Sequence, residues 1–454
     1  MSKPLFSEFD AVSAKEWKHK IQADLKGADY NETLIWESPE GIHVKPFYHQ
    51  DDFSEQHSPI PGHPGHWDVI QRIFVDDLKI ARKILIDALE NGAEAIWCAS
   101  EEEFEVARLL DGIDLAEVTF YFEFQFLSED FYLKLIDYCN AHGINAFYRL
   151  DIIHNLAKTG NWYHNLKEDH RILESVVVKA PGNTLGVDIG LFQNAGANIV
   201  QQLAYGLAQV NEYFNHLRDQ HTLGITYQVA VGSNYFFEIA KIRALRVLHA
   251  TLAREYGMPE TCHIIAVPSR RNKTLYDYNV NMLRTTTECM SAVLGGANAV
   301  CNQPYDAIYH KSNDFGERIS RNQLLILKSE SYFDQVANPA DGTYYIERLT
   351  RELAQKALDV FKSIEAGGGF LVQLKEGIIR KKIKESAQKE QDRYDDGTLV
   401  LLGTNKYPNE QDRMKDELQL YPFMKMRSGK TLLEPIIEKR ISETTEKGRL
   451  DNEN

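Results

Sequence analysis

Between about residues 92 and 302 the sequence alternates short runs rich in β-branched and aromatic residues with longer stretches of helical periodicity. This alternation is typical of a parallel sheet in which a helix follows each strand and returns the chain to the same end of the sheet. The candidate strands are EAIWCAS, VTFYFEFQF, INAFYRLDI, SVVVKA, GVDIGLF, GITYQVAVG, CHIIAVPS and NAVCNQP. About eight such strands predict a (β/α)8 barrel, with a doubly wound sheet as the alternative.

One connection does not fit this pattern. Only PGNTL separates SVVVKA from GVDIGLF, and five residues leave no room for a crossover helix between parallel strands. One of these two segments is therefore the weakest strand assignment.

The segments on either side of the barrel differ in character. Residues 1–65 hold one helix-like piece and then a loop-like stretch rich in His, Pro and Gly, too short to form its own core. We expect an extended arm that wraps a partner, with Trp17 and Trp36 as anchors. After a barrel domain over residues 66–370, residues 371–454 predict a helical linker segment and a charged tail that frays.

Composition excludes several classes of function. The formal net charge of −15 disfavours binding to nucleic acid or to anionic lipid. No apolar run reaches about 18 residues, and the N-terminal residues lack a signal-peptide pattern. The five cysteines form no C-x-x-C pair, which suits reduced thiols in a core. We expect a cytoplasmic protein that contacts neither nucleic acid nor membrane.

Two groups of residues could suggest a ligand site but do not fit one. Five histidines crowd between His43 and His66, yet prolines and glycines separate them, so no metal site is expected. The glycine-rich segments GGGF and LGGAN lack the spacing of a phosphate-binding loop and are better explained as helix ends.

Barrel enzymes place their reactive groups at the carboxyl ends of the strands. The charged residues at these ends are Arg149, Asp151, Arg270 and Arg271. None is a histidine or a cysteine placed for nucleophilic attack, so acid–base catalysis has no obvious agent. The four residues could form salt bridges over the mouth of the barrel or could bind an anionic ligand, and the sequence leaves both possibilities open.

The strand VTFYFEFQF is unusually bulky. With a period of two, its four phenylalanines (Phe120, Phe122, Phe124 and Phe126) share one face, and Tyr121, Glu123 and Gln125 share the other. Either face would fill the interior, so we expect a barrel plugged by side chains that holds no ligand along its axis.

The segment GERISRNQLLILKSESYFDQVANPADGTYYIERLTRELAQKA, residues 316–357, resembles a block of the methylmalonyl-CoA mutase family. The resemblance extends over about residues 67–410, and the N-terminal WKHKIQADLKGADYNETLIWESPEGIHVKPFY resembles the start of the small subunits of heterodimeric mutases. It implies a (β/α)8 barrel that carries acyl-CoA along its axis. It also implies a separate C-terminal domain that binds cobalamin through the histidine of a D-x-H-x-x-G motif.

The sequence departs from the catalytic members at each of these features. The pattern D-x-H-x-x-G occurs once, as DQHTLG at residues 219–224 inside the barrel segment, and does not occur after residue 370, so we expect no cobalamin-binding domain. Aligned on G-Y-H-x-x-E-A-G-A, the chain has Leu191 at the histidine and Asn194 at the glutamate. Where the family has T-H-C-Q-T-S-G, Val267 replaces the histidine and Ser269 the glutamine, and VIQRIFVDD lacks the tyrosine of R-Q-Y-A-G.

The resemblance therefore implies a small, non-catalytic subunit of a cobalamin-dependent methylmalonyl-CoA mutase. Such a subunit would itself have no catalytic residue and would bind no metal or cofactor. Adenosylcobalamin and the radical 1,2 rearrangement to and from succinyl-CoA would belong to a larger partner subunit, and this chain would stabilise the heterodimer. The alternative is a free-standing barrel protein that binds another anionic ligand at Arg149, Asp151, Arg270 and Arg271.

Overall fold

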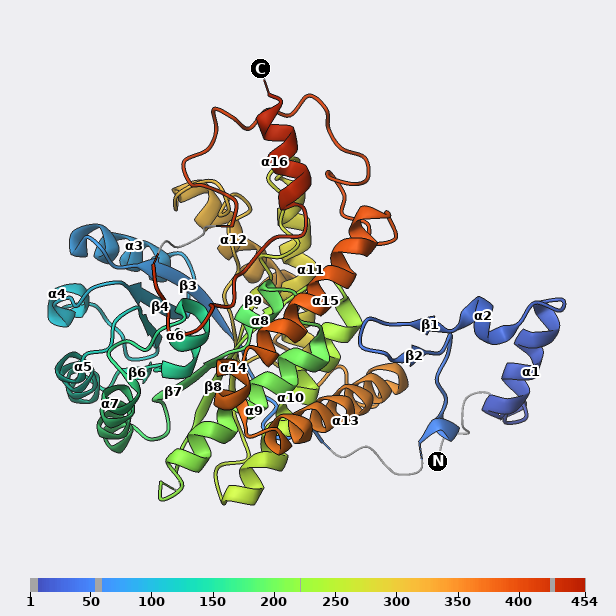
Figure 1. Ribbon diagram of the computed structural model, residues 1–454, viewed down its shortest axis with the longest axis horizontal. Coiled ribbons are helices and arrows are strands. Elements are labelled where there is room, and N and C mark those ends of the chain that lie inside the picture. The colour runs from blue at the N-terminus through green and yellow to red at the C-terminus, as the bar shows by residue number, and fades with distance from the viewer. Residues whose placement is uncertain (1–6, 54–58, 221, 425–428, 454) are drawn as a thin grey trace.

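The computed structural model describes residues 7–53, 59–220, 222–424 and 429–453 (Figure 1). Eight parallel strands form its centre. They are β3 (Asp68–Phe74), β4 (Ala95–Ser100), β5 (Thr119–Phe124), β6 (Asn145–Phe147), β7 (Leu185–Asp188), β8 (Ile225–Val231), β9 (His263–Pro268) and β10 (Ala299–Val300). They are hydrogen-bonded in the order β6-β5-β4-β3-β10-β9-β8-β7.

The two ends of this sheet meet just beyond β6. Leu150 and Leu185 form a parallel bridge. The backbone N–H groups of Tyr148 and Leu150 donate to the carbonyls of Asn183 and Thr184, each at 2.8 Å. These bonds join β6 to β7, so the eight strands form the predicted (β/α)8 barrel and not an open doubly wound sheet.

One strand assignment was wrong and one strand was missed. The segment SVVVKA lies in helix α7 (Leu166–Lys179), where Ile172, Leu173, Val176 and Val177 form a single buried face. This helical spacing of apolar residues outweighs the β-propensity of three consecutive valines. The eighth strand is β3, which lies before residue 92, where the alternation was read to begin.

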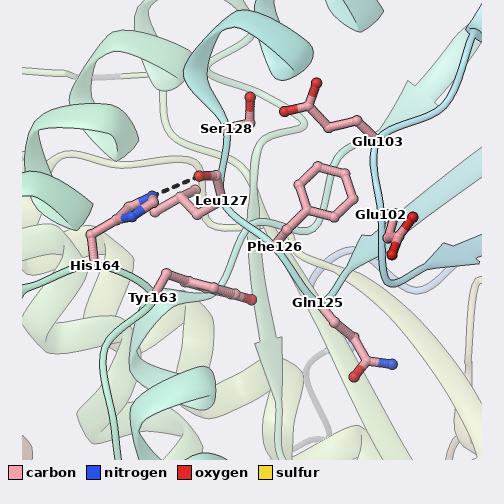
Figure 2. A pocket seen from close by; sticks show the side chains of 8 residues that line it. All are labelled: Glu102, Glu103, Gln125, Phe126, Leu127, Ser128, Tyr163 and His164. Atoms are coloured by element: carbon pink, nitrogen blue, oxygen red, sulfur yellow. Dashed lines mark hydrogen bonds between the residues drawn. The ribbon is translucent and has the colours of Figure 1, made fainter.

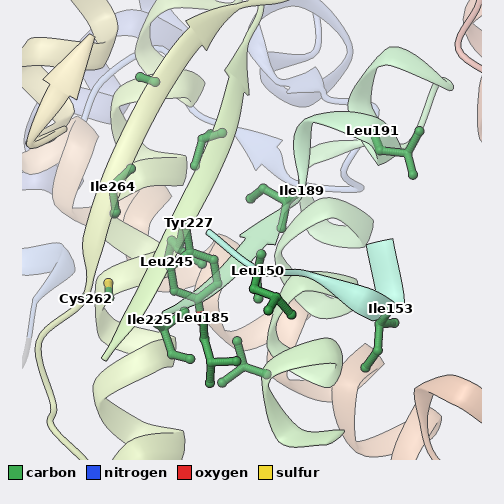
Figure 3. Packing of buried hydrophobic residues seen from close by; sticks show 14 of the residues in the cluster. Leu150, Ile153, Leu185, Ile189, Leu191, Ile225, Tyr227, Leu245, Cys262 and Ile264 are labelled. Carbon is green, nitrogen blue, oxygen red and sulfur yellow. The ribbon is translucent and has the colours of Figure 1, made fainter. Parts of the chain in front are cut away.

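Helices surround the barrel and supply the other half of its core (Figure 1). After α7 come α8 (Gly190–Asn194), α9 (Ile199–His216), α10 (Tyr235–Tyr256), α11 (Val280–Gly295), α12 (Asp314–Leu325) and its π-helical end η2 (Ile326–Glu330), α13 (Tyr344–Ala366), α14 (Phe370–Lys375), α15 (Ile378–Asp395) and α16 (Glu443–Asp451). Before α7 lie α3 (Leu78–Glu90), α4 (Val106–Leu110), α5 (Glu129–Ala141) and α6 (Ile152–Thr159). Figure 3 shows part of the resulting core, in which Leu185 and Ile225 on paired strands pack near Leu245 of α10.

The phenylalanines of β5 point out of the barrel. Phe120, Phe122 and Phe124 belong to the main core, where Phe124 packs edge-on against Phe131 of α5. The opposite face of β5 fills the interior. There a separate cluster, which we call the bore cluster, comprises Ile70, Ala95, Trp97, Tyr121, Ile265, Ala299 and Cys301, with Phe147 and Val267 packed against it. Trp97, Tyr121 and Phe147 therefore fill the interior along this stretch, and the phenylalanines of β5 do not.

The N-terminal arm has two parts. Its root, residues 36–53, packs on the barrel: Ile42 and Val44 join the main core, and Trp36 contacts Phe237 with ring centroids 5.6 Å apart. The root contains β1 (Trp36–Glu37), β2 (His43–Val44) and η1 (Gln50–Asp52). The outer arm, residues 7–35, contains α1 (Ala14–Asp24) and α2 (Tyr30–Leu34), which lie away from the barrel at the right of Figure 1.

The expectation of a frayed tail was wrong for residues 438–453. Arg440, Ser442 and Glu446 are buried, and the Arg440 guanidinium pairs with the Glu446 carboxylate. Glu446 also accepts a hydrogen bond from the backbone N–H of Leu275 at 2.8 Å. The buried polar residues of the tail bond to one another and to the rest of the chain instead of to water.

Within the described residues, no helix has the length and apolar character that crossing a membrane requires.

Candidate functional site

Figure 2 shows a pocket of about 430 Å³ where β4 and β5 end. Glu102, Glu103, Gln125, Phe126, Leu127, Ser128, Tyr163 and His164 line it. Its polar groups already have structural roles, since His164 Nε2 lies 2.8 Å from the carbonyl of Leu127 and the Tyr163 hydroxyl donates to the carbonyl of Phe124 at 3.2 Å. No hydrogen bond or ion pair joins His164 to Glu102 or Glu103 in the described part of the chain.

A second group of polar residues lies inside the barrel, above the bore cluster. We call it the barrel mouth. It comprises Arg72, Trp97, Glu123, Arg149, His154, Asp188 and Gln228, which come from strands β3, β4, β5, β7 and β8 and from the chain around α6.

Arg149 is the most unusual residue of the barrel mouth. Its backbone has φ +43°, a left-handed conformation that residues other than glycine rarely adopt. Gly186 on β7 permits the close approach, because a Cβ at that position would lie 2.9 Å from the Arg149 Cα. The guanidinium stacks on Trp97 at 4.3 Å and donates through Nη2 to Gln228 Oε1. Its Nε and Nη1 are buried and have no hydrogen-bond partner among the described residues.

Glu123 is held ionised in the same mouth. Its Oε2 accepts a hydrogen bond from Trp97 Nε1 at 3.0 Å and lies 3.3 Å from Arg72 Nη2. Burial alone would raise the pKa of this carboxyl, but the positive charges of Arg72 and Arg149 outweigh it and lower the pKa to about 2. Glu123 is therefore a fixed negative charge and not a proton donor near neutral pH.

Asp188 and His154 have the perturbed pKa values that often mark functional sites. Burial raises the pKa of Asp188 to about 6 and lowers the pKa of His154 to about 4. Gln228 Nε2 donates to Asp188 Oδ2 at 3.0 Å, and His154 Nδ1 lies 3.9 Å from the same oxygen. Asp188, His154, Gln228 and Arg72 were not predicted as site residues, although an acid and an amide inside apolar strands are visible signals in the sequence.

The four charged residues predicted at the strand ends do not come together. Asp151 caps α6 and accepts hydrogen bonds at Oδ1 from Gln209 Nε2 and the Tyr213 hydroxyl, both at 2.7 Å. Arg271 pairs with Glu390 of α15, and Arg270 is exposed. No ion pair joins Asp151 to an arginine in the described part of the chain. Arg149 alone of the four lies in the mouth.

The positions that correspond to catalytic residues of the family form a different arrangement. Leu191 on α8 is buried among apolar side chains, and Val267 packs on the bore cluster. Asn194 Oδ1 accepts a hydrogen bond from Ser269 Oγ at 3.2 Å, and Asn194 Nδ2 donates to Glu438 Oε1 at 2.8 Å. Asn194 thus finds hydrogen-bond partners for its amide within its own chain. None of the side chains of Leu191, Asn194, Val267 and Ser269 can transfer a proton near neutral pH.

A segment of the tail crosses the carboxyl end of the barrel beside these residues. We call residues 431–441 the C-terminal strap. Its backbone N–H groups at Leu433, Ile436, Lys439 and Ile441 donate to the carbonyls of Gly160, Ala157, Asn194 and Arg271, at 2.8–3.1 Å. A Cβ on Gly160 would lie 2.3 Å from the Leu433 carbonyl oxygen, so only glycine permits this approach. The strap thus ties α6, α8 and the loop after β9 together.

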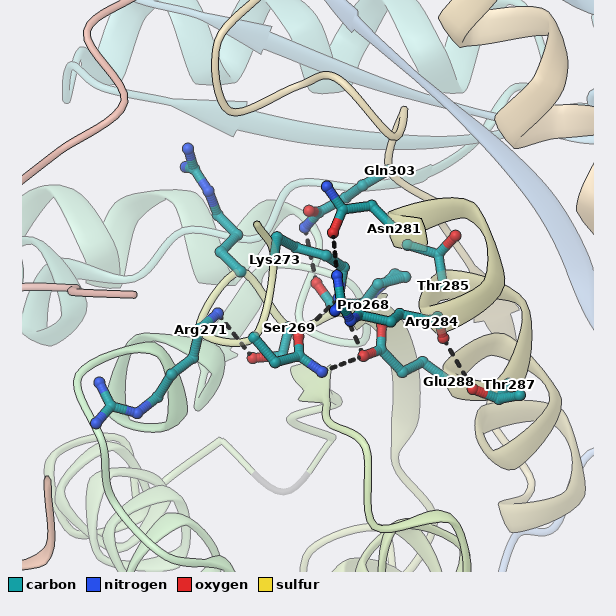
Figure 4. Close-up of polar contacts among 12 residues, drawn as sticks. Pro268, Ser269, Arg271, Lys273, Asn281, Arg284, Thr285, Thr287, Glu288 and Gln303 are labelled. Carbon is teal, nitrogen blue, oxygen red and sulfur yellow. Dashed lines mark hydrogen bonds and ion pairs between the residues drawn. The ribbon is translucent and has the colours of Figure 1, made fainter. Parts of the chain in front are cut away.

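The loop after β9 is also fixed from within (Figure 4). Lys273 Nζ lies 2.7 Å from Glu288 Oε2, and both side chains are almost fully buried. Asn272 Nδ2 donates to the other Glu288 oxygen at 2.7 Å, and Gln303 Nε2 donates to the carbonyl of Pro268 at 2.7 Å. A buried pair with its remaining hydrogen bonds made holds its loop rigidly.

One histidine of the N-terminal segment does approach two carboxylates. His66, Asp68 and Glu94 have ligand atoms within 4.8 Å of one another, as a metal site would require. The ammonium group of Lys328, however, lies 2.6 Å from Glu94 Oε2 and 3.2 Å from His66 Nε2. A lysine cation therefore occupies the position that a metal ion would take.

The fold and the barrel mouth define the class of this protein. It is a (β/α)8 barrel with a cluster of charged and titratable side chains inside its carboxyl half, the end at which barrel enzymes place their reactive groups. The family model described as methylmalonyl-CoA mutase matches residues 92–447. The chain therefore belongs to the methylmalonyl-CoA mutase family, a family of isomerases.

Similar proteins include both small subunits and whole mutases. The methylmalonyl-CoA mutase small subunit of Porphyromonas gingivalis is 33% identical, over 92% of this chain and 73% of its own length. The small subunit of Streptomyces virginiae is 29% identical, over 84% of this chain and 68% of its own length. The methylmalonyl-CoA mutase of Rhizobium meliloti is 26% identical, over 89% of this chain but only 65% of its own length.

Proposed function

We propose that this chain is the small, non-catalytic subunit of a cytoplasmic methylmalonyl-CoA mutase. A larger partner chain would bind adenosylcobalamin and interconvert methylmalonyl-CoA and succinyl-CoA. The bound cofactor would supply the radical chemistry, and this chain would stabilise the heterodimer.

The hydrogen bonds of Asn194 are the main support for a non-catalytic role. In the family's catalytic pattern a glutamate stands here, whereas this chain has an amide that bonds to Ser269 and to Glu438 of the C-terminal strap. A residue engaged on both sides by its own chain is not free to contact a substrate. The filled bore cluster gives further support, because Trp97, Tyr121 and Phe147 occupy the axis that an acyl-CoA would need.

The residues present also do not fit cobalamin in the family's manner. The one match to D-x-H-x-x-G, residues 219–224, lies between α9 and β8 along the chain, inside the barrel and not in a separate domain. The strap runs over α6, α8 and the loop after β9, at the carboxyl end where barrel enzymes carry out their chemistry. No step of the reaction is therefore assigned to side chains of this chain.

The outer arm is the surface that best fits a protein partner. Phe9, Val12 and Trp17 are 69, 56 and 50% exposed, and α1 buries none of its residues against the chain's own barrel. Apolar side chains that one chain leaves in water become favourable when a second chain covers them. An arm that reaches around the partner can contribute to an obligate interface of more than about 2,000 Å².

Reconstitution tests this proposal directly. The purified chain should show no turnover of succinyl-CoA with adenosylcobalamin, whereas a mixture with a long mutase chain carrying D-x-H-x-x-G should elute as one complex and be active. As a matched control, the doubly substituted chain Leu191→His with Asn194→Glu should remain inactive alone, since the bore stays filled. Turnover by the unmodified chain alone would overturn the proposal. Gel filtration separates it from the alternative of a free-standing barrel protein, which would stay monomeric in the mixture.

A further inference from the structure

Arg149 is a partly buried cation, and two of its guanidinium nitrogens make no hydrogen bond with the described residues. A guanidinium presents five N–H donors and can make charge-assisted hydrogen bonds in a fixed fork. Here Nη2 donates to the neutral amide oxygen of Gln228, while Nε and Nη1 are shielded from solvent and have no hydrogen-bond partner among the described residues. Buried donors in folded proteins are almost always paired, and the described residues supply no acceptor for these two nitrogens.

The two carboxylates nearest in the mouth are engaged elsewhere. Glu123 accepts from Trp97 Nε1 at 3.0 Å and pairs with Arg72 at 3.3 Å. Asp188 accepts from Gln228 Nε2 at 3.0 Å and from the backbone N–H of Gly190 at 2.8 Å. Neither forms an ion pair with Arg149, although both lie close enough to interact with it through space.

The backbone of Arg149 gives an independent reason to assign it a role. Its left-handed φ of +43° is unfavourable for any residue with a Cβ, and a glycine would adopt it without strain. Such strained positions concentrate at binding and catalytic sites, where the surrounding structure holds a side chain in place. In this case the strain aims the guanidinium across Trp97, which fixes its plane at 4.3 Å.

We propose that the barrel mouth binds a small monocarboxylate against Arg149. A carboxylate matches the planar guanidinium and would satisfy its free N–H groups. The acidic neighbours Glu123 and Asp188, and Glu438 of the C-terminal strap, penalise each added negative charge and favour a monoanion over phosphate. The bore cluster closes the axis below, so the ligand is limited to a few atoms.

Arg72 would attract the ligand to the entrance of the barrel mouth. Its side chain is 54% exposed while its guanidinium lies over the same Trp97 ring at 5.1 Å. A second cation between solvent and Arg149 attracts an anion toward the mouth and leaves it a short path inward. Arg72 therefore has a positioning role, and Arg149 makes the contact.

Calorimetric titration of the full chain with acetate tests the proposal, against sodium chloride and phosphate at matched ionic strength. Acetate should bind saturably at one site and raise the melting temperature, and phosphate should bind at least tenfold more weakly. The variant Arg149→Gln should weaken acetate binding at least tenfold. The control Arg270→Gln removes an exposed arginine at a neighbouring strand end and should bind acetate like the unmodified chain.

Three results of the titrations would overturn the site. They are acetate binding that does not saturate, equal binding by Arg149→Gln, and equal binding of phosphate, which would refute the preference for a monoanion. If Arg149→Gln does not fold, Arg149→Lys keeps the charge but not the planar fork and should bind acetate several-fold more weakly. A crystal soaked in bromoacetate should show the bromine anomalous signal in the barrel mouth, and a mouth holding water only would refute the proposal. These measurements need no partner or cofactor, so their outcome is separate from that of the proposed function.

Discussion

The outer arm allows one residue to be tested as an anchor for the partner. Trp17 lies on α1, which has no buried residue, and is 50% exposed, with an edge-on ring contact to Phe47 at 6.4 Å. Because that contact is with the root of the arm, replacing Trp17 by Ala should loosen the arm but change the melting temperature of the barrel little.

The same change should weaken assembly strongly. A tryptophan side chain can bury roughly 200 Å², so half exposure leaves about 100 Å² for the partner to cover. At about 25 cal/mol per Å² this area stabilises the complex by about 2.5 kcal/mol. Since about 1.4 kcal/mol corresponds to tenfold in affinity, Trp17→Ala should raise the dissociation constant about 60-fold.

Two measurements on the same protein preparations decide the matter. Differential scanning calorimetry gives the melting temperature of the chain alone, and sedimentation or titration calorimetry gives its affinity for the large chain. Trp36→Ala is the matched control, because Trp36 packs on Phe237 of the barrel at 5.6 Å and should lower the melting temperature. If Trp17→Ala instead lowered the melting temperature by several degrees and left the affinity unchanged, α1 would pack on its own barrel and the reasoning would fail.

Three further outcomes are expected. Burial raises the pKa of Asp188 from 3.8 to about 6, so the folded chain binds a proton that the unfolded chain releases, and stability falls as pH rises through this window. Asp188→Asn should flatten that slope in denaturant titrations between pH 4 and 6 and add up to roughly 3 kcal/mol at pH 7; an unchanged slope would contradict it. Gly160→Ala should detach the C-terminal strap and expose it to limited proteolysis, whereas Gly112→Ala, equally left-handed but facing open space, should not. The isolated chain should not change the absorption spectrum of adenosylcobalamin, and saturable micromolar binding would count against the non-catalytic role.

The barrel could be predicted from the sequence because its signal is local and repeated. Each strand and helix carries its own periodicity, and the alternation leaves few topologies. The error at SVVVKA has a local cause: valine propensity favoured a strand, while the spacing of Ile172, Leu173, Val176 and Val177 was helical. The error in the tail has a long-range cause, since Glu446 is buried through a bond to Leu275, which is 171 residues away.

The candidate site was only partly predictable for the same reason. Arg149 was found because it follows a strand, but nothing local shows that its guanidinium lacks partners. Asp151 follows the same strand, and its ligand-like carboxylate is bound by Gln209 and Tyr213 from α9. The two residues look alike in the sequence, and only the packing of α9 against the barrel separates a binding residue from a helix cap.

At the carboxyl end of this barrel, most of the polar groups named above hold the structure rigid, whereas those of Arg149 can bind a ligand. At Asn194 and Arg271 the chain uses its polar groups to bind Ser269, Glu390 and the C-terminal strap, so α8 and the loop after β9 cannot rearrange around a substrate. Catalysis requires groups that bond more strongly in the transition state than in the resting protein, and groups already paired have nothing further to offer. Arg149 is the exception, strained, oriented and with unpaired donors. A barrel of this kind can stabilise a partner through its outer arm and still bind a small anion at its centre, because the two functions use surfaces that share no residue.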